Sequence, residues 1–284
     1  MQKLYYIEPQ SITEVFQLLN TYGKKACVFA GGTDVIVNIR SNRVEPEIVI
    51  QLKKVAELNR DIEITDQGLK IGSLSTLSEV VKNGHINRWF PALAQAADSV
   101  GSVQIRNRAT LAGNICNASP AADTAPVLML YNSLVSILSE KGKRYVPVTE
   151  FFLGPRKTVL GQGEIVESIV LPVPQMKYGS AYLRMSRRKA VDLSSLGVGV
   201  LVGESGEVRI ALGAVGPKPF RAYKAEMLLK GNLYDEKAVE YALNAVAEEA
   251  GPITDLRASK EYRLEMMKEY TRRALQKALN VERI

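Results

Sequence analysis

Two segments of the sequence are rich in glycine, alanine and short polar side chains. The first segment, residues 29–34, reads FAGGTD, and the second segment, residues 106–126, reads RNRATLAGNICNASPAADTAP. Glycine and alanine let a backbone approach a ligand closely, and Ser, Thr and Asn add short hydrogen-bonding groups. We expect both segments to be loops that face each other and hold one long, polar, phosphate-bearing molecule between them.

The first segment has the composition of a phosphate-binding turn. Gly31 and Gly32 follow a short apolar run, and glycines there can adopt positive φ and turn their N–H groups toward a pyrophosphate. Asp34 would repel a phosphate, so we expect it to cap the next helix or to accept hydrogen bonds from a ribose, Arg106 or Arg108. Taken alone, FAGGTD is better explained as an ordinary tight turn.

The second segment mixes polar and apolar residues in a pattern that favours a packed binding element. Donors and acceptors are supplied by Thr110, Gly113, Asn114, Ser119 and Asp123. Apolar residues are interleaved with them at Leu111, Ile115, Pro120 and Pro126. A hydrophilic surface loop would not explain these apolar positions. Asp123 is suited to a ribose hydroxyl or to orienting the loop, and not to a phosphate.

Several common catalytic and cofactor motifs are absent from the sequence. It has no GxGxxG after a strand, no GxxxxGK[ST] and no HExxH. Its two cysteines, Cys27 and Cys116, are too few for an iron–sulfur cluster or a structural zinc site, and its one histidine, His85, is expected in a surface turn. We therefore predict no catalytic residue and no metal ligand, and we expect a bound cofactor to do the chemistry.

The composition is typical of a folded chain with two domains. Of the 284 residues, 46% are hydrophobic and 24% are charged, and no apolar run approaches the roughly 20 residues of a membrane span. We expect no membrane span and a cytoplasmic protein, because the first ten residues lack an apolar core. The net charge is +7, but the sequence has no basic stripe interleaved with aromatic residues, so we expect no nucleic acid partner. The basic groups at 184–189 and 263–277 are a hypothetical face for an acidic protein partner.

The elements that must position the first segment form a small βα unit that ends near residue 57. Ser11 and Glu14 have capping-box spacing, and the helix they begin is expected to stop at Gly23. A buried strand at 26–30 leads into the glycines, a short helical turn follows Asp34, and a second strand covers 48–50.

The elements around the second segment change to paired strands and helices. We expect strands at 62–65 and 69–72, a helix capped by Ser75 and running to residue 81, and an Ala-rich helix at 91–100. A hairpin at 133–138 and 144–148 and a strand at 164–171 follow. The proline-containing stretch at 171–175 is the predicted domain boundary.

The last part of the sequence predicts an α+β layer, in which strands are followed by helices. Three antiparallel strands are expected at 181–187, 195–202 and 207–214, and three helices at 221–230, 235–250 and 259–279. The last helix has a few apolar residues on a charged background, as an outer amphipathic helix does.

Four stretches of the chain resemble one protein family. They are FAGGTD, QIRNRATLAGNICNASPAADTAP at 104–126, SRRKAVDLSS at 186–195 and GPITDLRASKEYR at 251–263. The chain resembles the FAD-binding medium subunit of the molybdenum hydroxylases, the family of xanthine dehydrogenase and aerobic carbon monoxide dehydrogenase. The resemblance runs nearly from end to end.

The resemblance implies an α+β fold with FAD extended between two subdomains. A FAD-binding domain of the vanillyl-alcohol-oxidase type would occupy 1–174, with subdomains at about 1–57 and 58–174. A smaller α+β domain of the CO dehydrogenase flavoprotein type, with a three-stranded antiparallel sheet and helices, would occupy 177–284.

The resemblance also implies the residues that bind FAD. Those around the pyrophosphate would be Val28, Phe29, Ala30, Gly31, Gly32, Thr33, Asp34, Val35 and Ile36. Those on the other side would be Thr110, Leu111, Ala112, Gly113 and Asn114. Asp123 would contact the sugar or adenosine half, Ile165 a flavin or adenine ring, and Arg184 would lie near the isoalloxazine. Two residues depart from the family pattern, since Ala112 stands where a glycine is usual and Arg184 where a lysine is commoner.

The function implied is that of an electron-transfer subunit. Relatives pass electrons from a molybdopterin site on a large subunit, through [2Fe–2S] clusters on a small subunit, to FAD and then to NAD or another acceptor. Two alternatives stay open at this point. One is a stand-alone FAD-dependent reductase or flavin-binding protein without molybdenum partners, and the other is a scaffold that has lost flavin or a basic RNA-binding module.

Overall fold

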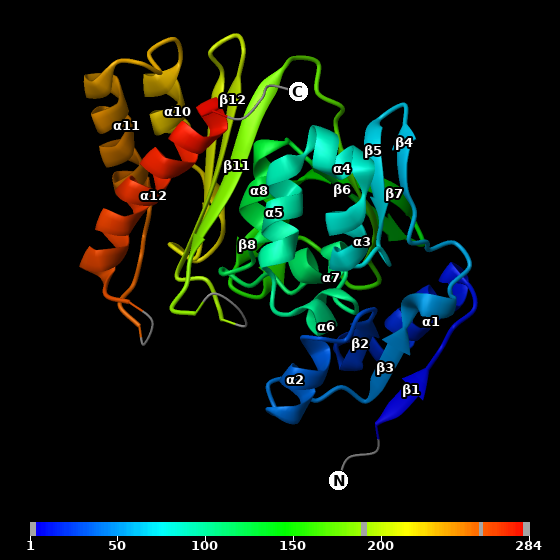
Figure 1. Ribbon diagram of the computed structural model, residues 1–284. Helices are drawn as coiled ribbons and strands as arrows, with labels where there is room; N and C mark the ends of the chain where they lie inside the picture. Colours follow the sequence, from blue (N-terminus) through cyan, green and yellow to red (C-terminus); the bar gives the residue numbers. More distant parts are fainter. Residues whose placement is uncertain (1–3, 189–191, 256–257, 281–284) are drawn as a thin grey trace.

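The computed structural model describes residues 4–188, 192–255 and 258–280 (Figure 1). Its strands form a three-stranded, a five-stranded and a four-stranded sheet and one two-stranded ribbon. Helices pack on each of the three sheets, and the chain mixes helices and strands in every part. The predicted α+β class is confirmed.

The first sheet is parallel and small. Its strand order is β1-β3-β2, with β1 at Tyr5–Ile7, β3 at Ile48–Gln51 and β2 at Ala26–Phe29. Helix α1 (Ile12–Tyr22) packs on it, 3-10 turns follow at Gly23–Lys25 (η1) and Leu52–Lys54 (η2), and α2 (Val35–Arg40) follows β2. The predicted helix and both predicted strands are confirmed, whereas β1 was not predicted.

The start of α1 differs in one detail from the predicted capping box. The Ser11 hydroxyl accepts a hydrogen bond from the amide of Glu14 at 3.3 Å, as expected. The Glu14 carboxylate, however, accepts from the amide of Gln10 at 2.9 Å and not from that of Ser11. The helix ends at Gly23 as predicted.

The second sheet has five antiparallel strands in the order β4-β5-β10-β6-β7. Their bounds are Ile62–Thr65 (β4), Gly68–Gly72 (β5), Ile165–Leu171 (β10), Leu134–Ser139 (β6) and Gly142–Pro147 (β7). Both predicted hairpins and the strand before the proline-containing stretch are confirmed. The sheet places β10, which is distant in sequence from β5, directly beside it.

Helices cover one side of this sheet, and most of the second segment lies among them (Figure 1). They are α3 (Leu77–Lys82), α4 (Gly84–Trp89), α5 (Pro91–Ser99), α6 (Val103–Arg106), α7 (Leu111–Cys116), α8 (Thr124–Leu130) and α9 (Val148–Phe151). A ribbon of β8 (Phe152–Gly154) and β9 (Lys157–Thr158) follows. The expectation that residues 106–126 form a loop is wrong, because α7 and the start of α8 lie within them.

Two local predictions in this region need correction. The cap of α3 is Thr76 and not Ser75, since Thr76 and Glu79 form a full capping box while the Ser75 hydroxyl donates to the carbonyl of Arg60 at 2.8 Å. His85 lies inside α4 and not in a turn. Its ring is exposed and stacks on Trp89 at a centroid distance of 5.1 Å.

The third sheet is antiparallel, with four strands where three were predicted. They are β11 (Tyr178–Met185), β12 (Leu196–Gly203), β13 (Val208–Gly213) and β14 (Phe220–Arg221). The predicted helices are α10 (Tyr223–Leu229), α11 (Glu236–Glu249) and α12 (Lys260–Asn280). The unpredicted strand β14 contributes two residues at the edge, paired with β13.

The third sheet is covered on both faces, which explains why every residue of β12 is buried. Helices α10 to α12 pack on one face, and α5 and α8 pack on the other (Figure 1). One polar contact in this second interface joins the Tyr131 and Ser180 hydroxyls at 2.7 Å. The third sheet is therefore packed against the helices that carry the second segment.

Of the arginines in the hypothetical basic docking face, two are turned inward and two are paired on the surface. Arg184 and Arg263 have buried side chains, and Arg263 donates to the carbonyl of Ala214. Arg272 and Arg273 pair with Glu240 and Glu269 at 2.7 and 2.6 Å. Lys189, at the end of the first basic group, lies outside the described residues. Among the helices of the described part, none is long and apolar enough to cross a membrane.

Candidate functional site

A cavity of about 580 Å³ lies where the two small-residue segments meet. This volume is within the range of roughly 300–1,000 Å³ that small-molecule and cofactor sites span. The segments touch at Gly31, where a Cβ atom would lie 2.1 Å from the backbone oxygen of Arg108. The predicted meeting of the two segments is therefore present in the fold.

The first segment makes a tight turn between β2 and α2. Gly32 has a φ of +77°, and a Cβ there would lie 2.1 Å from the ring of Phe29. Phe29 is thus folded under the turn, and the backbone of Gly31 and Gly32 is left to line the cavity. The amide of Ile36 donates to the carbonyl of Gly32 at 3.1 Å and closes the turn onto α2.

Asp34 occupies the position before α2, but its side chain makes no capping hydrogen bond within the described residues. Desolvation raises the pKa of this carboxyl, and the positive charge of Arg156 opposes the rise. Arg106, one of the two expected partners, instead pairs with Asp98 at 2.9 Å. Asp34 therefore lines the cavity, and the arginine whose charge acts on it is Arg156 and not Arg106.

The second segment presents α7 to the cavity. The Thr110 hydroxyl caps this helix by accepting a hydrogen bond from the amide of Gly113 at 2.9 Å. Asn114, one turn on, accepts from the hydroxyl of Thr124 at 2.6 Å and so ties α7 to α8. Ala112, at the departure from the family pattern, is almost fully buried and lines the cavity. The helical geometry turns Leu111 into the core, where it is fully buried.

The sheet side of the cavity is aliphatic. It is lined by Leu52, Leu160, Ile165 and Val166. Aliphatic side chains on one wall and backbone and amide groups on the other suit a molecule with flat rings and a polar linker. Ile165, which is predicted to lie against a ring, is part of this wall. These residues fit FAD. The buried Ser73 hydroxyl, which has no partner among the described residues, also leaves a hydrogen bond for a ligand to make.

Glu164, which also lines the cavity, is held by charged hydrogen bonds at the start of β10. Its carboxylate accepts two bonds from Arg144, at 2.8 and 2.7 Å, and one from the amide of Gly161 at 2.7 Å. Arg144 also donates to the carbonyl of Val159 at 3.1 Å. This network fixes the turn whose Leu160 lines the cavity.

We expect Glu164→Gln to lower the free energy of unfolding by about 1 kcal/mol at neutral pH, since Arg144 is partly exposed and the pair is screened. The Arg144 hydrogen bonds lower the pKa of Glu164 against the opposing effect of desolvation. The stabilisation of the fold by ionised Glu164 is therefore fully present above the unfolded pKa of about 4.3. It is lost as the pH falls through the lower pKa of the folded state.

Denaturant unfolding of both proteins between pH 7 and pH 2 checks this expectation. The matched control is Glu63→Gln, because Glu63 meets Lys70 at the longer distance of 3.7 Å and its side chain is 50% exposed, against 16% for Glu164. A difference between wild type and Glu164→Gln that persists unchanged at the acid end would contradict the assignment.

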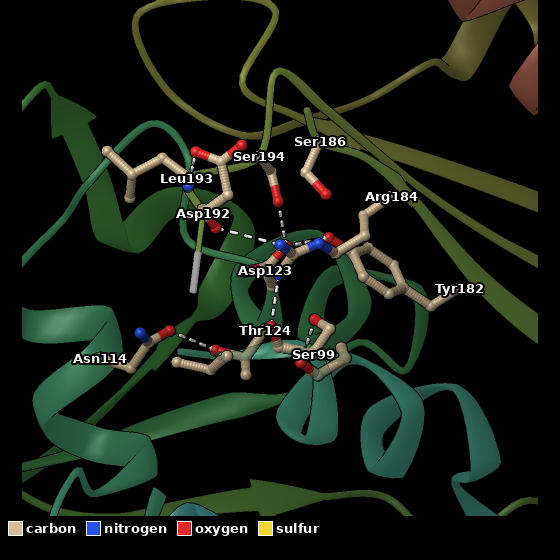
Figure 2. A network of polar contacts seen from close by, with 12 residues as sticks. Ser99, Asn114, Asp123, Thr124, Tyr182, Arg184, Ser186, Asp192, Leu193 and Ser194 are labelled. Carbon is tan, nitrogen blue, oxygen red and sulfur yellow. Dashed lines mark hydrogen bonds and ion pairs between the residues drawn. The ribbon is translucent and has the colours of Figure 1, made fainter. Parts of the chain in front are cut away.

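Asp123 joins the second segment to the third sheet (Figure 2). Its Oδ1 accepts hydrogen bonds from the hydroxyls of Tyr182, at 2.7 Å, and Ser194, at 2.5 Å. Its Oδ2 lies 3.7 Å from the guanidinium of Arg184. Burial raises the pKa of Asp123, and the two hydroxyls and the arginine oppose the rise. Tyr182 and Arg184 of β11 thus hold the carboxylate in place, and Asp123 also lines the cavity.

Arg184 is buried behind Asp123 and is not among the described residues that line the cavity. Its guanidinium donates to the carbonyls of Ser99 and, at 3.0 Å, Asp192 (Figure 2). Asp192 and Leu193, from the stretch that carries part of the family resemblance, line the cavity instead. The charge of Arg184 therefore acts on the site through Asp123.

The structure brings most of the predicted site residues together. Those that line the cavity are Val28, Ala30, Gly31, Gly32, Thr33, Asp34, Val35, Thr110, Ala112, Gly113, Asn114, Asp123 and Ile165. Among the described residues, four predicted ones lie outside the lining, namely Phe29, Ile36, Leu111 and Arg184. Lining residues that were not predicted include Leu52, Ser73, Val100, Leu160, Val166 and Leu193. Of these, only Leu193 lies in one of the four stretches that resemble the family, and the others carry no local signal.

Cys116 contributes a neutral thiol to the cavity wall. Burial raises the pKa of the Cys116 thiol to about 12, so the thiol is protonated at neutral pH. Both Cys116 and Cys27 are free thiols. In the described part of the chain, no group of three or more His, Cys, Asp or Glu residues is placed to hold a metal ion.

Two family models match the chain. The model of the FAD binding domain in molybdopterin dehydrogenase matches residues 2–174. The model of the CO dehydrogenase flavoprotein C-terminal domain matches residues 181–278.

Similar proteins of known type span nearly the whole chain. The xanthine dehydrogenase FAD-binding subunit of Escherichia coli O157:H7 is 33% identical over 261 residues, which cover 90% of this chain and 89% of that protein. A solved structure of carbon monoxide dehydrogenase from Hydrogenophaga pseudoflava, which lacks the Mo-pyranopterin moiety of its cofactor, matches with a TM-score of 0.93 and 29% identity, covering 98% and 97% of the two chains. Quinoline 2-oxidoreductase from Pseudomonas putida 86 matches with a TM-score of 0.89 and 27% identity, covering 97% and 96%. This chain therefore belongs to the FAD-binding subunits of the molybdenum hydroxylases, and it is an oxidoreductase subunit whose cofactor is FAD.

Proposed function

We propose that this chain holds FAD in the cavity between its two small-residue segments and serves as the electron-transfer subunit of a molybdenum hydroxylase complex. The observation that carries the proposal is the 580 Å³ cavity, which both segments line and in which backbone, amide and aliphatic groups face one space. Family membership supplies the identity of the ligand.

Different residues of the cavity wall would bind different parts of FAD. Backbone amides around Gly31, Gly32 and Thr33 would hold the pyrophosphate, because a turn with positive φ directs N–H groups to one side. Residues 110–114 would bind from the other side, and the fixed carboxylate of Asp123 would accept a hydrogen bond from a sugar hydroxyl. Bound FAD supplies the redox chemistry of the subunit.

The same proposal divides the chain into functional parts. Residues 1–174 form the FAD-binding domain, with subdomains at about 1–57 and 58–174, and residues 177–284 form the C-terminal domain. The contact of Asp123 with Tyr182 and Ser194 makes the second domain part of the binding site, because these hydroxyls hold a carboxylate that lines the cavity.

The partners belong to this proposal as well. We assign the other redox centres to a large molybdopterin-binding subunit and a small [2Fe–2S] subunit, since two cysteines cannot ligate a cluster. The relatives support this view, because their names identify them as subunits or medium chains. NAD or another acceptor would take the electrons. A cytoplasmic location is supported by the two free thiols, which are usual in a reducing compartment.

Purification of the protein from its native host tests the assignment. We expect flavin, iron and molybdenum to elute together with this chain, and the reduced complex to be reoxidised anaerobically by NAD if NAD is the acceptor. A yellow flavoprotein that elutes without iron or molybdenum would overturn the complex and support the stand-alone reductase. A colourless protein that stays colourless with saturating FAD would overturn both.

A further inference from the structure

Ser73 has a buried hydroxyl with no hydrogen-bond partner among the described residues. The residue is 3% exposed, and it lines the cavity between the two small-residue segments. It directly follows β5, a strand of the five-stranded sheet. An unpaired buried hydroxyl is costly in a folded protein, so it requires an explanation.

The backbone around Ser73 is fixed on both sides. Its amide donates to the carbonyl of Glu167 on β10 at 2.9 Å, and the amide of Leu74 donates to the carbonyl of Asn59 at 3.0 Å. Leu74 belongs to the same hydrophobic cluster as Leu52 and Ile165, two residues of the aliphatic cavity wall. Ser73 therefore borders the wall that suits a flat ring, and its position does not depend on a ligand.

The hydroxyls beside Ser73 are all used by the protein. Ser75 donates to the carbonyl of Arg60 at 2.8 Å, Thr76 donates to the carboxylate of Glu79 at 2.8 Å, and Thr110 caps α7. Loose local packing of polar groups thus does not explain why Ser73 is different. Ser73 lines the cavity, as Thr110 does, and of these four hydroxyls its own is the one without a partner among the described residues.

We propose that the Ser73 hydroxyl hydrogen-bonds a nitrogen or oxygen atom on the edge of a ring of bound FAD. The inference rests on the proposed function, because it places FAD in this cavity. A hydroxyl can donate to a ring nitrogen or carbonyl and can accept from a ring N–H or amino group, so it suits either the isoalloxazine or the adenine. Ser73 is then a binding residue that orients the ring against the aliphatic wall.

The test compares the full-length wild type with Ser73→Ala and Ser133→Ala. Ser133 is the matched control, because its hydroxyl is also fully buried and unpartnered in the described part of the chain but lies outside the cavity lining. Each apoprotein is titrated with FAD, and its thermal unfolding is measured without FAD. Absorption spectra of the loaded proteins are recorded in parallel.

We expect Ser73→Ala to bind FAD about three- to ten-fold more weakly, as the loss of one neutral hydrogen bond implies. The apoprotein is expected to unfold at the same or a higher temperature, because the substitution removes an unpaired polar group. A structural role alone would give the opposite sign for unfolding. Shifted flavin bands would assign the contact to the isoalloxazine, and unshifted bands with weaker binding would assign it to the adenine.

Two results would overturn the assignment. One is wild-type affinity in Ser73→Ala, and the other is an equal loss of affinity in Ser133→Ala. These results differ from a failure of the proposed function, in which the wild type itself would bind no FAD.

Discussion

Replacing Gly31 by alanine is expected to weaken FAD binding by about 10- to 100-fold. The new Cβ atom would lie 2.1 Å from the backbone oxygen of Arg108, at the point where the two small-residue segments touch. Backbone atoms cannot move aside as a flexible side chain can, so the segments must separate. Overpacking of this kind costs about 1–3 kcal/mol, and the displaced segments no longer present their amides to one ligand.

Titration of the apoprotein with FAD measures this loss, and thermal unfolding shows how much of the strain is present without ligand. Gly84→Ala is the matched control, since Gly84 begins α4 and an added Cβ there meets nothing within 4 Å. We expect wild-type affinity in the control. Wild-type affinity in Gly31→Ala would show that FAD does not depend on the contact between the segments.

Asp123→Ala is expected to lower the free energy of unfolding by about 3 kcal/mol and to weaken FAD binding. The substitution leaves the buried guanidinium of Arg184 without its carboxylate, and removing one partner of a buried pair is strongly destabilising. It also removes the acceptor of the Tyr182 hydroxyl, which is buried in the same network. The contact between the second segment and the third sheet is weakened as a result.

The control for this experiment is Asp98→Ala. Asp98 pairs with Arg106 at 2.9 Å, which is closer than the 3.7 Å between Asp123 and Arg184, but the Asp98 side chain is 61% exposed. Exposed pairs contribute less than about 1 kcal/mol, so we expect only a small change. Denaturant unfolding at neutral pH compares the two variants, and equal losses would contradict the role given to burial.

Local sequence patterns predicted the longer elements, because these elements bury one face and have their own turn or cap residues. The hairpin of β6 and β7 is an example, since its strands flank a turn that ends in Gly142, which has a φ of +116°. Strands β1 and β14 were missed because they have three and two residues. Such short strands exist only through pairing with β3 and β13, which a local pattern cannot show.

The cavity was predictable where its residues lie within the two segments and not elsewhere. The small residues of both segments indicated a ligand, but only the turn geometry shows that Phe29 lies beneath Gly32. Ser73 comes to the cavity through the packing of distant elements and no local pattern marks it, whereas Leu193 lies in the stretch 186–195 that resembles the family. Arg184 was expected beside the flavin, whereas the carbonyls of Ser99 and Asp192 hold it behind Asp123.

A crystal structure of the protein with bound FAD is the most direct test of where the cofactor lies. We predict that the pyrophosphate contacts the backbone of Gly31 and Gly32, that residues 110–114 lie on its other side, and that a ring packs on Ile165. FAD bound elsewhere on the chain, with this cavity filled only by water, would contradict the account.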